Sequence, residues 1–146
     1  MWTPDITVAA VCEKNGRFLL VEERSKSTGE IVFNQPAGHL EAGETIIDAV
    51  IRETLEETCR HFTPEYLVGI YRLEADNGKT YIRYTFSGAI SDIDDNYQLD
   101  PDIISTHWLS SASISENNAL RSPIVNACIN DYKNGSRHSL DVLKEL

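Results

Sequence analysis

The sequence predicts a mixed α/β sandwich, in which helices cover the faces of a β-sheet. Three observations lead to this class: short apolar or β-branched runs, Asn-Gly turns between such runs, and two helical segments among them. No internal repeat, low-complexity stretch or linker divides the chain. Its 146 residues suffice for one well-buried core, so we expect a single domain over residues 1–146.

Six segments have the composition of β-strands. The pairs Asn15-Gly16 and Asn77-Gly78 tolerate the positive φ angles of tight turns, so we expect each to join two neighbouring strands in an antiparallel hairpin. The predicted strands are residues 7–12, 17–23, 31–34, 67–73, 81–90 and 107–109.

Two further segments have helical signals. The first covers about residues 43–58, and its Thr45 with Asp48 resembles a capping box that has Asp in place of the usual Glu. The second follows Ser122-Pro123, where Ser can cap the helix and Pro fits its first turn. It ends near Gly135, a residue suited to a left-handed cap.

The net charge of -10 makes some classes of binding partner unfavourable. Nucleic-acid polymers are poor candidates, because their binding depends on clustered Lys and Arg. A small phosphorylated molecule would also be repelled, unless divalent cations bridge its oxygens to protein carboxylates. The charge balance therefore favours a metal if the substrate is anionic.

The apolar and cysteine patterns indicate a cytoplasmic protein with no membrane contact. The longest N-terminal apolar run, residues 6–12, is far shorter than the roughly 20 residues of a membrane span. The N-terminus also lacks the basic residues that begin a signal peptide. Cys12, Cys59 and Cys128 are widely spaced and odd in number, which suits reduced thiols rather than disulfides or a zinc site.

The first predicted helix carries a concentrated acidic face. At about 100° per residue, Glu53, Glu56 and Glu57 share one arc beside the apolar arc expected to pack on the sheet. Glu53 and Glu57 form a like-charge i, i+4 pair, which destabilises a bare helix unless cations bind. A solvated acidic surface is the alternative. The apolar arc comprises Ile46, Ile47, Val50, Ile51, Thr54 and Leu55.

Glycine, glutamate and an acidic block recur at fixed spacings around this helix. Gly38 is followed after five residues by Glu44, and after seven more by the block Arg52-Glu53-Thr54-Leu55-Glu56-Glu57. This pattern, within residues 38–60, resembles the Nudix box. The resemblance implies a Nudix-type α/β/α sandwich with a mixed central β-sheet. It also implies a loop, a helix and a loop that hold Mg²⁺ against a substrate diphosphate, with Mn²⁺ as a possible substitute. Hard divalent cations of this kind prefer oxygen ligands.

The resemblance also implies roles for individual residues. The metal ligands would be the carboxylates of the acidic helix and a main-chain carbonyl just before the box glycine. A box arginine would orient these carboxylates, and a further glutamate would fix the loop. These expected residues are Glu53, Glu56, Glu57 and Ala37 as metal ligands, Glu53 and Glu57 as catalytic residues, and Arg52 and Glu44 as supporting residues.

The chain departs from the box after Glu57. Cys59 stands where the box has glycine, and Arg60 where it has an apolar residue. The helix could therefore end in a different cap or continue one turn longer. A nucleophilic Cys59 is an alternative, although the surrounding carboxylates would raise its pKa and suppress the thiolate.

A further resemblance, to the phosphatase NudJ group of this family, rests on residues 34–42 and 120–123, with Tyr132, Gly135 and Arg137. It implies action on nucleoside di- and triphosphates and on hydroxymethylpyrimidine diphosphate, giving monophosphates.

Four basic side chains are candidate substrate contacts, each with a structural alternative. Arg83 lies on one face of the predicted strand 81–90 and either binds a substrate phosphate or stands on a solvated face. Arg24 could instead lie in a solvated loop. The ring nitrogens of His39 could instead form their hydrogen bonds with a neighbouring backbone group. Arg121 either binds an anion or supports the fold.

Asp102 is the candidate acid outside the box. Several Nudix enzymes carry such an acid before a short strand with a Trp, and Asp102 precedes Trp108 by six residues. It would be a metal ligand or the acceptor of the water proton. Asp100 is the nearest competitor, and an ordinary Asp-Pro-Asp turn is the structural alternative.

The expected function is attack of a metal-activated water on phosphorus, in a small phosphorylated metabolite or nucleotide. Hydrolysis of ADP-ribose or another nucleoside diphosphate derivative is the alternative. A noncatalytic Nudix-like binding module, a prenyl-diphosphate isomerase and an interaction protein are rivals from other classes. Both a monomer and a homodimer are compatible with the sequence.

Overall fold

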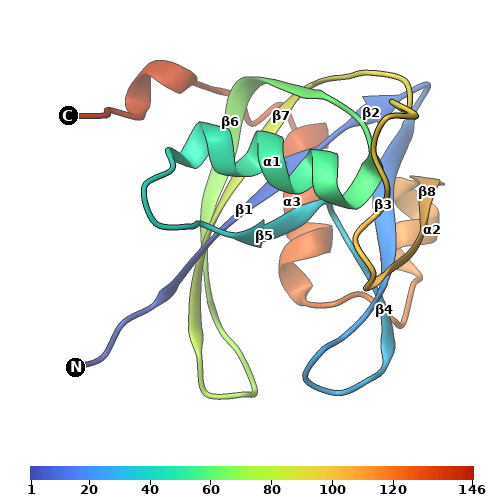
Figure 1. Cartoon of the computed structure of the whole chain (residues 1–146), viewed down its shortest axis with the longest axis horizontal. Helices are drawn as coiled ribbons and strands as arrows, with labels where there is room; N and C mark the ends of the chain where they lie inside the picture. Colours follow the sequence, from blue (N-terminus) through green and yellow to red (C-terminus); the bar gives the residue numbers. More distant parts are fainter.

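Two β-sheets and two main helices form the fold, in a computed structural model that describes residues 1–146 (Figure 1). In the large sheet, the strand order is β5-β1-β7-β6-β9. Only the β1–β7 pair is parallel, so this sheet is mixed, as the sequence predicted. Its strands are β1 (Asp5–Val11), β5 (Ala37–His39), β6 (Phe62–Glu74), β7 (Thr80–Ile90) and β9 (His138–Ser139).

The small sheet is centred on β3, which pairs with β2, β4 and β8. After β8, the last strand of this sheet in the sequence, come the short helix α2 and the main helix α3. A 3₁₀ turn at Leu140–Val142 follows β9. The strands are β2 (Glu13–Lys14), β3 (Arg17–Arg24), β4 (Ile31–Asn34) and β8 (Ile103–Ser110), and the helices are α1 (Ile46–Thr58), α2 (Ser111–Ser115) and α3 (Pro123–Lys133).

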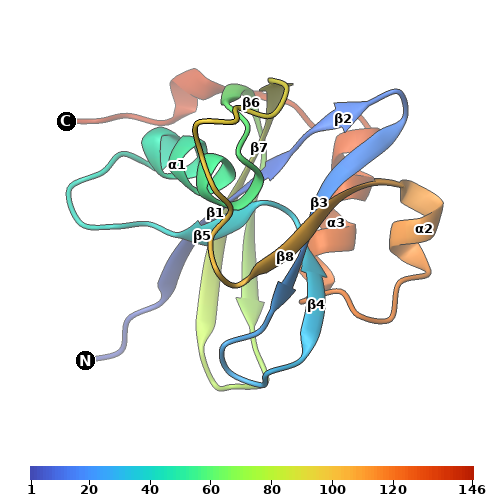
Figure 2. The ribbon, with the colours of Figure 1, turned by 45° about the vertical axis from the view of Figure 1, so that its right-hand side comes forward.

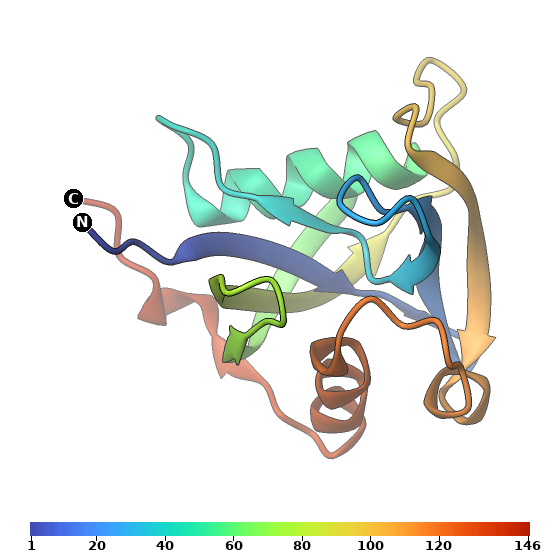
Figure 3. The same cartoon turned by 90° about the horizontal axis from the view of Figure 1, so that it is seen from below.

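The helices α1 and α3 cover opposite faces of the large sheet (Figure 3). This arrangement confirms the predicted α/β/α layering. Because side chains alternate along a strand, β1 serves both layers. Val8 and Ala10 pack with Val50 of α1, whereas Val11 packs with Val125 of α3.

The helix ends follow the predicted capping residues. Thr45 Oγ1 accepts a hydrogen bond from the amide of Asp48 at 3.0 Å, and α1 begins at the next residue. Ser122 Oγ accepts from the amide of Ile124 at 3.2 Å, and Gly135 adopts a φ of 89° just after α3.

One predicted hairpin is present and the other is only partly right. β6 and β7 pair around the Asn77-Gly78 turn, as expected. At Asn15-Gly16, however, β3 pairs with the two residues of β2, while the predicted strand 7–12 becomes β1 of the large sheet. Its parallel partner β7 lies far along the chain, so local sequence carried no sign of this pairing.

Several short elements have no signal in the sequence. β5, α2, β9 and the 3₁₀ turn are too short for a hydrophobic period to identify them. The predicted strand 107–109 is the C-terminal part of the longer β8. None of the helices has the length and apolar composition that crossing a membrane requires.

Candidate active site

The acidic face of α1 lies beside β5, and the two are joined by a buried hydrogen bond. Glu57 is only 8% exposed, and its Oε1 accepts from the backbone N–H of Ala37 at 2.8 Å. The alternative of a solvated acidic surface is therefore wrong for Glu57, which is buried. The expected role of the Ala37 carbonyl as a metal ligand stays a prediction.

Gly38 allows Glu53 to lie directly against the backbone of β5. A Cβ atom placed on Gly38 would come within 2.1 Å of the Glu53 Cδ. A side chain at position 38 would therefore force the Glu53 carboxylate to move, which is a steric reason for glycine at this position of the box. The approach brings the carboxylate of Glu53 to the same strand that Glu57 contacts.

Arg52 connects the carboxylates of the box. Its Nε and Nη2 donate to the two oxygens of Glu44 at 2.9 and 2.6 Å, a paired geometry that fixes the guanidinium plane. Its Nη1 donates to Glu53 at 2.9 Å and to Glu56 at 3.2 Å. Its Nη2 also donates to the carbonyl of His39 at 3.0 Å, so Arg52 ties the loop to the helix.

Burial sets the protonation of these acids. Burial raises the pKa of Glu53 to about 7, although Arg52 acts in the opposite direction. Burial also raises the pKa of Glu57 well above its ordinary value, because the single amide from Ala37 offsets little of the lost solvation. In contrast, the hydrogen bonds from Arg52 lower the pKa of Glu44.

This donor set fits a hard divalent cation. Glu53 and Glu57 are desolvated carboxylates whose charges repel each other, and a cation would relieve both costs. No three His, Cys, Asp or Glu side chains converge into a ready-made cage. Divalent cations can also be held by one or two carboxylates together with water and substrate phosphates.

Glu23 is a further acid of this region that sequence reasoning missed. It is 9% exposed, and its pKa is raised by burial. Arg121 Nη1 donates to Glu23 Oε1 at 3.0 Å, so the predicted anion contact is already engaged by a carboxylate. The strand period offered a signal, because Leu19, Val21 and Glu23 share one face of β3 and the first two are buried.

Arg83 is buried, so the alternative of a solvated position is wrong. The residue is 8% exposed, and its Nη1 donates to Gln35 Oε1 at 3.2 Å. Its Nε has no hydrogen-bond partner, and neither has Gln35 Nε2. Glu57 and Glu23 are among the charges that act on Arg83, which places this guanidinium beside the acidic region. Gln35 was not singled out from the sequence.

His39 and Arg24 are exposed and engaged in local contacts. His39 Nε2 lies 3.2 Å from Asp5 Oδ2, and its ring contacts Tyr81 edge-on. Arg24 Nη1 donates to the carbonyl of Gly29 at 3.0 Å, which closes the loop between β3 and β4. Neither contact requires a substrate.

The loop between β7 and β8 brings two acids toward α1. Asp102 Oδ2 lies 3.1 Å from Lys26 Nζ on the β3–β4 loop. The charge of Asp100 acts on both Glu53 and Glu57, raising their pKa values. The role expected for Asp102 stays a prediction, and Asp100 is the loop acid that acts on the acidic face of α1.

Cys59 ends α1 in the left-handed conformation that glycine would adopt, with φ 57° and ψ 28°. The helix therefore stops at Thr58 and does not continue. The thiol is 5% exposed, and its pKa is raised by burial and by Asp94 and Asp100. These conditions suppress the thiolate that a nucleophile would need.

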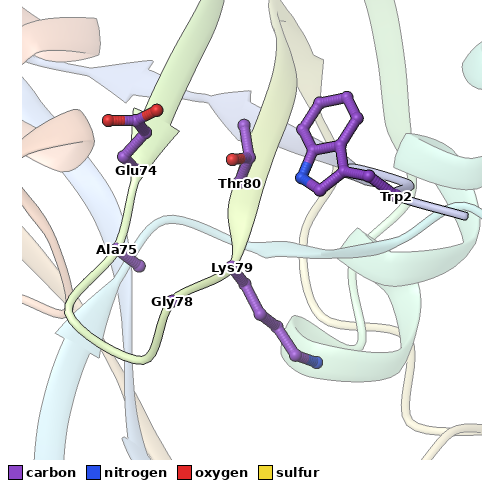
Figure 4. A pocket seen from close by; sticks show the side chains of 6 residues that line it. All are labelled: Trp2, Glu74, Ala75, Gly78, Lys79 and Thr80. Atoms are coloured by element: carbon purple, nitrogen blue, oxygen red, sulfur yellow. The ribbon is translucent and has the colours of Figure 1, made fainter.

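Two surface hollows lie outside the acidic face. A cavity of about 360 Å³ at the end of the β6–β7 hairpin lies beside the exposed indole of Trp2 (Figure 4). It contains none of the box residues. A smaller cavity of about 200 Å³ lies where α3 begins, and Arg121 is among its lining residues.

Comparison with known proteins agrees with this geometry. The family model described as NUDIX domain matches residues 1–127. The chain is 36% identical over 143 residues to phosphatase NudJ of Escherichia coli (strain K12), covering 98% of this chain and 92% of that protein. Phosphatase NudJ of Shigella flexneri matches to the same extent.

Solved structures give the same result. A NUDIX hydrolase from Nitrosomonas europaea is 46% identical, with a TM-score of 0.93 and coverage of 99% of this chain and 98% of that chain. A MutT protein from Methanosarcina mazei Go1, 22% identical with a TM-score of 0.76, covers 94% of this chain and 99% of that chain and shares the fold. This chain belongs to the NUDIX family and is a Nudix hydrolase.

Proposed function

We propose that this hydrolase uses Mg²⁺ to cleave the diphosphate linkage of nucleoside di- or triphosphates, or of a small pyrimidine diphosphate, to monophosphates. The observation that carries the proposal is the set of three carboxylates on α1, of which Glu57 is buried against β5 and Glu53 against Gly38. The similarity to proteins named phosphatase NudJ supports the choice of small phosphorylated substrates.

The residues that would hold the ion are Glu53, Glu56, Glu57 and the carbonyl of Ala37. Bound Mg²⁺ supplies charge neutralisation at the phosphate oxygens and lowers the pKa of a bound water. Mn²⁺ suits the same oxygen ligands. Arg52 fixes two of the carboxylates, and its paired hydrogen bonds to Glu44 keep the guanidinium in place.

Arg83 is the cation best placed to bind a substrate phosphate. Its Nε has no hydrogen-bond partner, so this group still needs an acceptor. The charge of Glu57 acts on Arg83, which indicates that the guanidinium lies near the acidic residues of α1. Arg121 balances Glu23 and has a weaker claim on substrate. Arg24 and His39 are held by Gly29 and Asp5, so their claim is weaker still.

The acceptor of the water proton would come from the β7–β8 loop. Asp102 and Asp100 are the two candidates. Asp102 is paired with Lys26, whereas Asp100 acts on the acidic face itself.

The substrate would be a small metabolite and not a nucleic-acid polymer, in keeping with the net charge of -10. The three cysteines are free and buried, which agrees with the proposed cytoplasmic location.

The test is a panel of nucleotides, nucleotide sugars, ADP-ribose and small diphosphates, assayed with Mg²⁺ and resolved by product. Monophosphates released from small diphosphates or nucleoside di- and triphosphates are the expected result. A marked preference for ADP-ribose would replace the substrate class with the alternative one. If no compound in the panel releases phosphate, the proposed function fails and a noncatalytic binding module is the remaining hypothesis.

A further inference from the structure

The loop of residues 91–102 runs from β7 past the C-terminal end of α1 to β8 (Figure 2). It is a long connection without secondary structure of its own, yet backbone hydrogen bonds attach it to the helix. The amide of Asp94 donates to the carbonyl of Cys59 at 2.7 Å, and the amide of Asp100 donates to the carbonyl of Glu56 at 3.0 Å. These carbonyls belong to the last turn and cap of α1, where such groups lack partners within the helix.

One side-chain pair reinforces the start of this loop. His61 Nε2 lies 2.8 Å from Asp94 Oδ2, and the ring of His61 contacts Tyr97 edge-on with centroids 5.7 Å apart. The other carboxylate oxygen of Asp94 accepts from the backbone and side-chain nitrogens of Asn96, each at 3.0 Å. Asp94 therefore joins His61 to the turn that follows it.

The backbone around His61 is bound to the same loop. The amide of His61 donates to Ser91 Oγ at 2.8 Å, and the amide of Ser91 donates to the carbonyl of His61 at 3.0 Å. An exposed hydrogen-bonded side-chain pair contributes little to stability on its own. Here the pair shares a site with several backbone hydrogen bonds and an aromatic contact, which fixes its geometry.

We propose that His61 is a positioning residue, which through Asp94 holds the loop 91–102 on the end of α1 so that Asp100 faces the carboxylates of that helix. The proposal rests on the proposed function. Hydrogen bonds from His61 and Asn96 keep the pKa of Asp94 below its ordinary value, so the carboxylate is a charged acceptor at neutral pH. The amide of Asp100 donates to the carbonyl of Glu56 at 3.0 Å, so the position of the loop controls where Asp100 lies relative to the acidic helix.

Hydrogen exchange of the loop amides is the first test, because it does not depend on activity. In His61→Ala, exchange in peptides covering 92–102 should rise on the order of tenfold, while the peptides of α1 stay protected. Wild-type exchange in that variant would overturn the proposal. Asp92→Asn is the matched control, because Asp92 lies on the same loop, its side chain is 97% exposed, and its charged partner is Lys14 at 3.7 Å rather than His61.

Catalysis and metal affinity are the second test. In His61→Ala, kcat and the affinity of the protein for Mn²⁺ should each fall about tenfold, as is typical when a group that supports a metal site is lost. His61→Gln, whose amide can donate to Asp94, should restore both. Faster loop exchange with unchanged kcat and Mn²⁺ affinity, or no rescue by Gln, would overturn the positioning role.

A double variant checks that the two residues act together. If His61 and Asp94 act as one unit, the double variant His61→Ala with Asp94→Ala should lose no more kcat and Mn²⁺ affinity than either single variant. Additive losses would contradict the proposal. Asp94→Ala also serves if His61→Ala does not fold. If the wild-type chain hydrolyses nothing in the substrate panel, the proposed function fails, and loop exchange and Mn²⁺ affinity alone decide whether His61 positions the loop.

Discussion

The helices α1 and α3 cover opposite faces of one sheet, but only α3 follows the ordinary preferences of a helix. α3 buries apolar side chains such as Val125 and has Lys133 in its last turn. α1 has no basic residue in its last turn and instead carries Glu53, Glu56 and Glu57 toward its C-terminus. Acids in the last turn, here Glu56 and Glu57, interact unfavourably with the helix dipole, typically by several tenths of a kcal/mol each when ionised.

This difference indicates that the acidic residues of α1 reduce the stability of the protein and serve the chemistry of the site instead. The buried carboxyl of Glu57 has no cation partner in the metal-free protein, and its raised pKa means that ionising it there costs free energy. Nothing comparable occurs on the buried face of α3, which consists of Ile124, Val125, Cys128 and Ile129. Substitutions in α1 should therefore affect turnover more than stability, and substitutions in α3 should do the reverse.

Glu57→Gln should have the largest effect, lowering turnover by orders of magnitude while the fold persists. The amide oxygen of Gln can still accept from Ala37, but the charge that would face a cation is gone. The measurement is turnover at saturating Mg²⁺, with thermal unfolding as the control for folding. Near-normal turnover would refute the catalytic role of Glu57.

Gly38→Ala should lower turnover on the order of a hundredfold, because misplacing a catalytic group by about 1 Å has effects of this size. The new Cβ would meet Glu53 at 2.1 Å and displace its carboxylate. Gly135→Ala, after α3, is the control. It has a positive φ of 89° but no atom within 4 Å of its Cβ, so it should reduce stability by about 1 kcal/mol and leave turnover unchanged. Equal turnover losses in both variants would remove the steric argument.

Val125→Ala should destabilise the protein by about 2 kcal/mol and leave the turnover of folded molecules unchanged. Val125 is fully buried in the cluster beneath α3, with no contact to the acidic residues. Urea unfolding gives the stability, and activity is normalised to the folded fraction. A large fall in kcat would show that the two faces of the sheet are coupled.

Cys59→Gly should have the smallest effect, a stability change within about 1 kcal/mol and unchanged turnover. Glycine relieves the left-handed strain at φ 57° but loses the buried thiol. Cys59→Ala keeps the strain and loses the thiol, so it should be the less stable of the two in thermal unfolding. Abolished turnover in a folded Cys59→Ala protein would restore the nucleophile hypothesis.

The sequence by itself determined the local part of this molecule. Helical spacing placed Glu53, Glu56 and Glu57 on one acidic arc, and the caps at Thr45 and Ser122 placed two helix starts. These features depend on residues within a few turns of one another. Periodicity and capping report such short-range interactions directly.

Tertiary structure decided the rest, because it depends on contacts between distant parts of the chain. The parallel pairing of β1 with β7 and the burial of Arg83 beneath Gln35 have no local signature. Glu57 becomes a buried acid only because β5 passes beside α1, and Glu23, from a distant strand, lies near enough for its charge to act on Glu57. All of these side chains are polar, and only the packing of segments far apart in the sequence determines which of them are removed from solvent.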